Sequence, residues 1–276
     1  MTDQIIAAAV SGEVRRAAGA NRENALDVAN ATLRFGDVTA FKDVTLKVSP
    51  GEFISIVGPS GCGKTTILNY AAGLLPADTL SAGSITVFSQ KPTIGNKKLG
   101  YMLARDSLMM WRTALRNAEF GAEARGMREK ERRERAMHLL EKVGLKGFEN
   151  SYPKSLSHGM RQRVALARTF CMDADMLLMD EPFGALDAQT KFQLEELLLS
   201  LWQESQRTVL FVTHDLAEAI ALGDRVVVMA PRPGRVLADI PVDLPRPRNL
   251  RALQKTDLFH ELYKQVWSTM EEGFAV

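Results

Sequence analysis

The sequence predicts an α/β fold built on a mostly parallel sheet, and two observations carry that prediction. Four short, continuously apolar runs are typical of strands covered on both faces: residues 53–57, 176–179, 208–212 and 226–229. Stretches with helical patterns lie between them, among them residues 64–72, 157–171 and 188–204. Strands that alternate with helices form parallel sheets through right-handed crossovers.

Composition limits the classes of function that the chain can have. Its 276 residues suffice for one sizeable α/β domain with a lobe inserted in it. A formal net charge of +2 provides no strong field of one sign, so we expect no nucleic-acid partner. Two cysteines, Cys62 and Cys171, cannot build a disulfide framework. No stretch approaches the ~20 apolar residues of a membrane span, so a membrane role must come from another polypeptide.

The chain divides into three predicted parts. Residues 1–24 are Ala-rich and polar and are predicted to be a flexible N-terminal extension. Residues 25–245 form the main domain, with an α-helical subdomain inserted at about 105–160 that contains helices at 112–123 and 128–143. The mixed charges of residues 128–135 are typical of a solvated helix face rather than of a nucleic-acid patch.

Residues 246–276 are predicted to be a linker and an amphipathic helix. The apolar residues of this tail recur at helical spacing and form one stripe. We expect the stripe to dock on the chain's own core, with binding to a partner as the alternative. Its members are Leu258, Phe259, Leu262, Tyr263, Val266, Trp267 and Met270.

A glycine-rich segment directly after the strand at 53–57 has the features of a phosphate-binding loop. Gly58, Gly63, Lys64 and Thr65 satisfy the pattern G-x-x-x-x-G-K-[ST]. Glycines let successive backbone N–H groups converge on an anion, and the helix that follows adds roughly half a positive charge at its start. The loop residues predicted to surround the phosphates are Gly58, Ser60, Gly61, Cys62 and Gly63.

The first residues of the following helix have separate predicted roles. Lys64 should reach the β- and γ-phosphates, and the Thr65 hydroxyl should bind Mg²⁺. Thr66 is a candidate contact to the α-phosphate. Cys62 lies beside the helix start and Lys64, where a thiol pKa tends to fall. An unreactive small residue that fills the loop is the alternative for Cys62.

Acidic and imidazole side chains follow two other predicted strands. Asp180 and Glu181 come at the carboxyl end of the strand at 176–179, where α/β sheets bind ligands. Asp180 is placed to hold Mg²⁺, and Glu181 to take a proton from an attacking water. His214 ends the strand at 208–212 in the same row and can contact the γ-phosphate. His138 and His260 have no such position and are interpreted as structural.

A second helix start suited to anions lies at residues 156–163, which read Leu-Ser-His-Gly-Met-Arg-Gln-Arg. Ser157 is a good N-cap, and Gly159 permits close approach of the backbone. This segment resembles the signature of ABC transporter ATPases, which reads Leu-Ser-Gly-Gly-Gln in most members. His158 and Met160 depart from that pattern without removing the Ser157 cap or Gly159.

The resemblance covers about residues 26–245 and implies a P-loop NTPase core with an N-terminal antiparallel β subdomain. It implies that two subunits face head to tail, so that the Ser157 region of one caps the ATP held by Lys64 of the other. Glu181 then resembles the catalytic base and His214 the switch histidine. Asp187 resembles the aspartate of the D-loop, which crosses the dimer interface.

Phe35 resembles the aromatic residue that stacks on adenine in this family, although a core aromatic would look the same.

A finer resemblance is to importers of the nitrate/sulfonate/taurine type. It rests on residues 111–113, 159–163, 183–187 and 231–234. It implies an ATP- and Mg²⁺-dependent ATPase at the cytoplasmic face of the inner membrane. Its partners would be transmembrane permease subunits, with a solute-binding protein acting indirectly.

One residue departs from the family at a place that matters. Ala104 stands where most members carry a glutamine that touches Mg²⁺ and water, and a methyl group can do neither. Hydrolysis is then slower, or Asp106 or a water substitutes, or coupling runs differently. A weakly hydrolysing regulatory subunit and a non-transport ABC-type ATPase therefore remain as alternatives. The next residues, Met109, Met110 and Trp111, form either a surface for a permease helix or part of the lobe's core.

Overall fold

The fold is described from a computed structural model that covers residues 23–104, 106–184 and 186–274. The predicted N-terminal extension lies outside these residues except for Glu23 and Asn24.

The four apolar runs form the centre of a six-stranded sheet, as predicted. Its order is β5 (Leu99–Met102), β6 (Met176–Asp180), β7 (Thr208–Val212), β3 (Phe53–Val57), β8 (Arg225–Met229) and β9 (Val236–Pro241). All neighbours are parallel except β8 and β9. Side chains of β3 alternate between two cores, since Phe53 and Val57 join one and Ile54 and Ile56 the other. A strand buried on both faces explains why these runs are continuously apolar.

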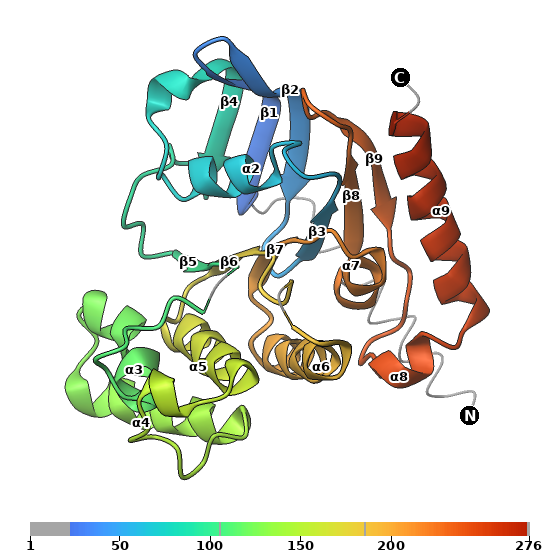
Figure 1. The fold of residues 1–276 in the computed structure, drawn as a ribbon. Coiled ribbons are helices and arrows are strands. Elements are labelled where there is room, and N and C mark those ends of the chain that lie inside the picture. The colour runs from blue at the N-terminus through green and yellow to red at the C-terminus, as the bar shows by residue number, and fades with distance from the viewer. Residues whose placement is uncertain (1–22, 105, 185, 275–276) are drawn as a thin grey trace.

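A second sheet confirms the predicted antiparallel β subdomain. It has the order β2 (Val38–Val48), β1 (Leu26–Phe35), β4 (Leu80–Val87). Leu26 pairs with Val48 on one side and with Val87 on the other. Helix α2 (Lys64–Ala71) follows β3 directly and lies between the two sheets (Figure 1).

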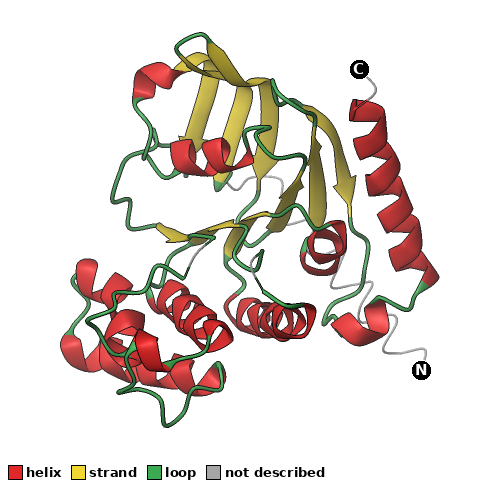
Figure 2. Ribbon diagram, viewed as in Figure 1, coloured by secondary structure: helices red, strands yellow, loops and turns green. Residues whose placement is uncertain are grey.

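Three helices cover the opposite face of the large sheet: α5 (His158–Cys171), α6 (Ala188–Ser205) and α7 (Leu216–Leu222). Helices α3 (Ala114–Ala124) and α4 (Glu129–Lys142) lie inside the predicted insertion and pack against α5, as the cluster of helices in Figure 2 shows. Helix α3 begins two residues later than predicted because Thr113 caps it, its hydroxyl accepting from the Arg116 N–H. Short 3₁₀ turns occupy Ala77–Thr79 and Pro153–Ser155.

The C-terminal segment comprises α8 (Leu250–Leu253) and α9 (Asp257–Phe274), and α9 packs along α7, β8 and β9. Its docking face is narrower than the predicted stripe. Phe259, Leu262 and Val266 are buried, whereas Tyr263 and Trp267 are 36% and 44% exposed and stack on each other. The stripe prediction was too wide because spacing alone does not show how much of a helix its neighbours cover.

A cluster of charged side chains is buried between α6 and α7. Glu195 and Glu218 are both nearly inaccessible, and Lys191 lies within ion-pair distance of each. Burial, with a contribution from the charge of Glu218, raises the pKa of Glu195 to about 8. The cost of ionising a carboxyl group away from water explains the direction of this shift.

This shift predicts how stability depends on pH. The folded protein binds the Glu195 proton more tightly than the unfolded chain, whose carboxyl has an ordinary pKa of 4.5. The contribution of Glu195 to the free energy of unfolding therefore falls as pH rises from 4.5 to about 8. Glu195→Gln, which mimics the neutral acid, should raise Tm by several degrees at about pH 8.5 and by much less at about pH 5.

Thermal unfolding followed by circular dichroism at the two pH values measures this difference. Glu196→Gln is the matched control, because the neighbouring Glu196 is 40% exposed in its side chain and pairs only loosely with Arg251 at 3.8 Å. A Glu195→Gln gain that is equal at both pH values would contradict the prediction.

Candidate functional site

The phosphate loop, residues 58–64, connects β3 to α2 in a conformation that requires glycine. Gly63 has φ 98°, a left-handed value that other residues adopt only with strain. At Gly58 the limit is space, since a Cβ there would lie 2.7 Å from the backbone oxygen of Met229. These constraints account for the fixed glycines of the motif and leave the first N–H groups of α2 directed to the loop.

Lys64 is folded into the loop. Its side chain is 5% exposed, and its Nζ donates to the carbonyl oxygens of Gly58 at 2.8 Å and Pro59 at 3.0 Å. These partners, and the Cys62 sulfur at 3.9 Å, are neutral groups rather than a carboxylate. The loop therefore places a positive group beside the N–H groups of a helix start.

Thr65 and Asp180 meet at the loop from different elements. The Thr65 hydroxyl donates to Asp180 Oδ1 at 2.9 Å. Burial raises the pKa of Asp180, and the charge of Glu181 adds to the effect, while the Thr65 hydrogen bond and Lys64 oppose it. A nearby cation would offset this cost of ionising Asp180.

A site with two oxygen donors suits Mg²⁺, and it does not suit a metal that is held by protein ligands alone. Within the described residues no group of three or more His, Cys, Asp or Glu side chains could hold a metal ion. Mg²⁺ is usually held by one or two protein oxygens together with substrate phosphates and water. Thr65 and Asp180 supply that number.

Glu181 and His214 meet at the ends of neighbouring strands. His214 Nδ1 lies 3.1 Å from Glu181 Oε2. Glu181 has φ 45°, a left-handed value that is uncommon for a residue other than glycine, and its N–H donates to the carbonyl of Val212 on β7. Such a conformation costs roughly 1–3 kcal/mol and is concentrated at functional sites. The fold thus holds Glu181 in a fixed direction beside Asp180.

A second group of predicted residues lies at the starts of α5 and α6. Ser157 caps α5 by accepting from the Met160 N–H at 3.2 Å, and Asp187 caps α6 by accepting from the Thr190 N–H at 2.9 Å. Gly159 faces α6 closely, because a Cβ there would lie 2.8 Å from Thr190 Cγ2. No hydrogen bond or ion pair found among the described residues joins this group to the phosphate loop. The structure therefore brings the predicted residues together in two sets and not in one.

Other predicted residues are placed around these sets. Phe35 ends β1 and is 44% exposed, so it is no core aromatic. Ser60 and Gly61 lie on the exposed side of the loop, and Thr66 is half-buried in the first turn of α2. Gly184 lies beside Glu181 and His214 in space, since a Cβ on Gly184 would lie 3.6 Å from His214 Cε1. Residue 185 lies outside the described residues.

The prediction of a lowered Cys62 pKa was wrong. Cys62 is fully buried, and burial raises the pKa of its thiol despite the opposing charge of Lys64. The nearby helix start and lysine were visible in the sequence, but the exclusion of water was not. Cys62 is a buried filler of the loop, which was the alternative interpretation.

The loop that contains Ala104 is fastened to α5. Arg161 donates from Nε to Asp106 Oδ2 at 2.8 Å, and Arg168 donates to the backbone oxygens of Asp106 and Ser107. The carboxylate of Asp106 is thereby held by the helix that Ser157 caps. If Asp106 took over the role of the glutamine that Ala104 replaces, its ion pair with Arg161 would break.

Residues 109–113 form an outward-facing turn. The buried amide of Asn117 organises it, accepting from the Met109 N–H and donating to the carbonyls of Met109, Arg112 and Thr113. Trp111 is 77% exposed and Met110 56% exposed. Packing inside the lobe is therefore wrong for these two side chains.

Sequence reasoning missed Arg232, whose Nε donates to the Gly61 carbonyl at 3.4 Å. The turn that carries it packs on the phosphate loop, since a Cβ at Gly234 would overlap the Cys62 carbonyl. A Pro-Gly turn signal gives no sign of such a distant contact. Sequence reasoning also missed the ion pairs of Lys191 between α6 and α7.

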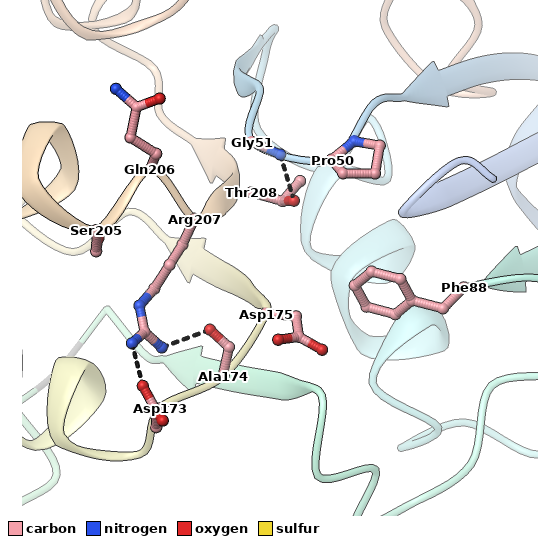
Figure 3. Close-up of a pocket in the computed structure, with 10 residues that line it drawn as sticks. All are labelled: Pro50, Gly51, Phe88, Asp173, Ala174, Asp175, Ser205, Gln206, Arg207 and Thr208. Atoms are coloured by element: carbon pink, nitrogen blue, oxygen red, sulfur yellow. Dashed lines mark hydrogen bonds and ion pairs between the residues drawn. The ribbon is translucent and has the colours of Figure 1, made fainter. Parts of the chain in front are cut away.

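A separate cavity of about 390 Å³ lies at the opposite edge of the large sheet, where β6 and β7 begin (Figure 3). Arg207 points across it and donates to the Ala174 carbonyl, as Figure 3 shows. No predicted site residue lines it, so it is distinct from the phosphate site.

Among the described helices, none is long and apolar enough to cross a bilayer.

Comparison with known proteins gives concordant results. The family model described as ABC transporter matches residues 41–184. A putative ATP-binding protein of Brucella abortus (strain 2308) is 44% identical over 238 residues, which cover 86% of this chain and 90% of that protein. The taurine import ATP-binding protein TauB of Jannaschia sp. (strain CCS1) is 39% identical over 264 residues, covering 90% of this chain and 96% of that protein.

Among solved structures, the dimeric post-hydrolysis state of the ATP-binding cassette MJ0796, bound to ADP and Pi, is similar with a TM-score of 0.67 and 33% identity. The match covers 79% of this chain and 99% of that one.

Proposed function

The chain belongs to the ABC transporter family as an ATP-binding subunit, and we propose that it hydrolyses ATP to drive solute uptake through a separate permease. The observation that carries the proposal is the convergence of Lys64, Thr65, Asp180, Glu181 and His214 at one edge of the sheet. Each is a group that phosphoryl transfer to water needs.

Binding of ATP begins at the phosphate loop. The ammonium of Lys64 turns from the carbonyls of Gly58 and Pro59 to the β- and γ-phosphates, while loop N–H groups and the Thr66 hydroxyl donate to other phosphate oxygens. Thr65 and Asp180 would hold Mg²⁺, which when bound would supply positive charge to the phosphates. Phe35 stacks on the adenine from its exposed position at the end of β1.

Hydrolysis depends on Glu181. Its carboxylate accepts the proton of the attacking water, and its left-handed backbone fixes the direction from which it does so. His214, at 3.1 Å from that carboxylate, is within reach of both the base and the γ-phosphate. Loss of the phosphate then changes the hydrogen bonding of His214 and the loop that follows it.

A second copy of the chain completes the site. Ser157 and Gly159 form an anion-binding helix start at α5, and Asp187 begins α6 beside it; no described contact joins these residues to the phosphate loop of the same copy. In a head-to-tail dimer they would cap the ATP held by the other copy. The dimeric MJ0796 structure supports this arrangement.

The partner in the membrane is a permease. The exposed Met110 and Trp111 form an apolar, adaptable surface next to the Ala104 loop, which suits a permease helix. The subunit then lies peripherally on the cytoplasmic face of the inner membrane. The predicted solute is of the nitrate, sulfonate or taurine class and is delivered to the permease by a solute-binding protein; the TauB relative, which is named for taurine import, supports this class.

A weakly hydrolysing regulatory subunit is the second candidate, because of Ala104. The Asp106 carboxylate is engaged by Arg161 and is not available to replace the glutamine without loss of that ion pair. The two candidates share ATP binding and differ in turnover.

The proposed function predicts two separable defects. Lys64→Ala should weaken binding of Mg-ATP by tenfold or more, since it removes the principal cation, on the order of 1.4 kcal/mol or more. Glu181→Gln should retain binding but lower kcat by roughly 10²–10⁴-fold, the range for loss of a general base. Calorimetric titration and phosphate release measure the two effects. Unaltered hydrolysis by Glu181→Gln, or tight binding by Lys64→Ala, would exclude this site.

Ala104→Gln tests the second candidate. Restoring a group that orients water should raise kcat about tenfold with little change in the KM for ATP. Ala104→Leu is the matched control, because it adds similar bulk without hydrogen-bonding atoms. If the parent turns over ATP well above background and as fast as Ala104→Gln, the regulatory candidate is excluded; no turnover in the parent and recovery in Ala104→Gln would favour it. Co-purification of the tagged chain with a membrane permease tests the association that the proposed transport requires.

A further inference from the structure

The buried charged cluster between α6 and α7 is centred on Lys191. Its Nζ lies 2.7 Å from Asp215 Oδ2, 3.6 Å from Glu218 Oε2 and 4.0 Å from Glu195 Oε1. Its side chain is only 17% exposed. One cation therefore serves three carboxyl groups, Glu195 on α6 and Asp215 and Glu218 at the start of α7.

On the α7 side, the cluster defines the loop that carries His214. Asp215 caps α7 by accepting from the Ala217 and Glu218 N–H groups. The Thr213 hydroxyl donates to Glu218 and accepts from the Asp215 N–H. The residues on both sides of His214 are thus fixed to the same cluster, while the imidazole itself stays exposed.

On the α6 side, Lys191 lies one turn from the helix start. Its own N–H donates to the Asp187 carbonyl at 2.9 Å. Asp187 caps this helix and is fully exposed, at the surface proposed to meet the second copy. A rigid helical turn thus separates the exposed Asp187 from the ammonium that holds Asp215.

The charges favour the pairing with Asp215. Burial works against the charge on Lys191, but Glu218, Asp215 and Glu195 outweigh it and raise its pKa. Although burial alone would raise it, the pKa of Asp215 is lowered, through its hydrogen bond to Lys191. Both partners stay ionised at neutral pH, whereas burial raises the pKa of Glu218 to about 7 and that of Glu195 to about 8. The charge of the neighbouring, half-buried Glu196 also raises the pKa of Glu195.

We infer that Lys191 is a positioning residue that sets His214 through Asp215, linking the start of α6 to the γ-phosphate end of the site. The inference rests on the proposed function. A shift of α6 when two copies meet would move the Lys191 ammonium and, through Asp215 and Thr213, the loop on which His214 is mounted. Hydrolysis would then respond to pairing of the subunits without a direct contact between Asp187 and the water.

Lys191→Met tests this by removing the charge and keeping the length of the side chain. It should lower kcat about tenfold while the KM for ATP changes by about twofold or less, because His214 is misplaced and the phosphate loop is intact. Lys191→Arg, which keeps the cation, should recover most of the rate. Amide hydrogen exchange of residues 212–218 without nucleotide should become about tenfold faster in Lys191→Met and not in Lys191→Arg.

Lys142→Met is the matched control, since Lys142 on α4 also forms an ion pair with α6, but through Glu204 at the end of that helix opposite to Lys191. It should alter neither kcat nor exchange at 212–218. Equal loss of kcat in Lys142→Met and Lys191→Met, or no recovery in Lys191→Arg, would overturn the inference. A parent without ATPase activity would sink the proposed function instead, and the exchange comparison would still decide whether Lys191 holds the loop.

Discussion

The conformation of the phosphate loop is the constraint on which the rest of the site depends. Its backbone passes so close to Met229 and turns so sharply before α2 that only glycine fits at positions 58 and 63. The turn directs the first N–H groups of α2 to one place and holds the Lys64 ammonium against carbonyl oxygens. An anion of the size of a triphosphate satisfies all of these donors at once.

The parallel sheet supplies the other half of the site. Because β6, β7 and β3 run in the same direction, the residues that follow them emerge at one edge, and Asp180, Glu181 and His214 meet Thr65 there. The left-handed Glu181 is tolerated because its N–H is paired with β7. The strands thus fix the positions of these side chains. The helix starts at Ser157 and Asp187 lie at a separate surface, where a second copy would bind.

Local patterns in the sequence were sufficient to predict most of the large sheet and the position of the phosphate loop. Continuously apolar runs marked β3, β6, β7 and β8, and the glycine-lysine motif marked the phosphate loop, because each depends on residues adjacent in the chain. The width of the α9 docking face, the raised pKa of Cys62 and the exposure of Trp111 depend on neighbours far away in sequence. The Lys191 cluster was missed for the same reason, since residues 191 and 215 look like ordinary surface charges until α6 and α7 are placed together.

Two copies of this chain should enclose ATP between the phosphate loop of one and the Ser157 turn of the other. Sedimentation velocity of Glu181→Gln, with and without saturating Mg-ATP, measures this most directly. We predict a monomer without nucleotide and a dimer holding two ATP molecules with it, and loss of the dimer when Ser157→Arg is added. A species that stays monomeric at saturating Mg-ATP, alone and together with its permease, would contradict the account.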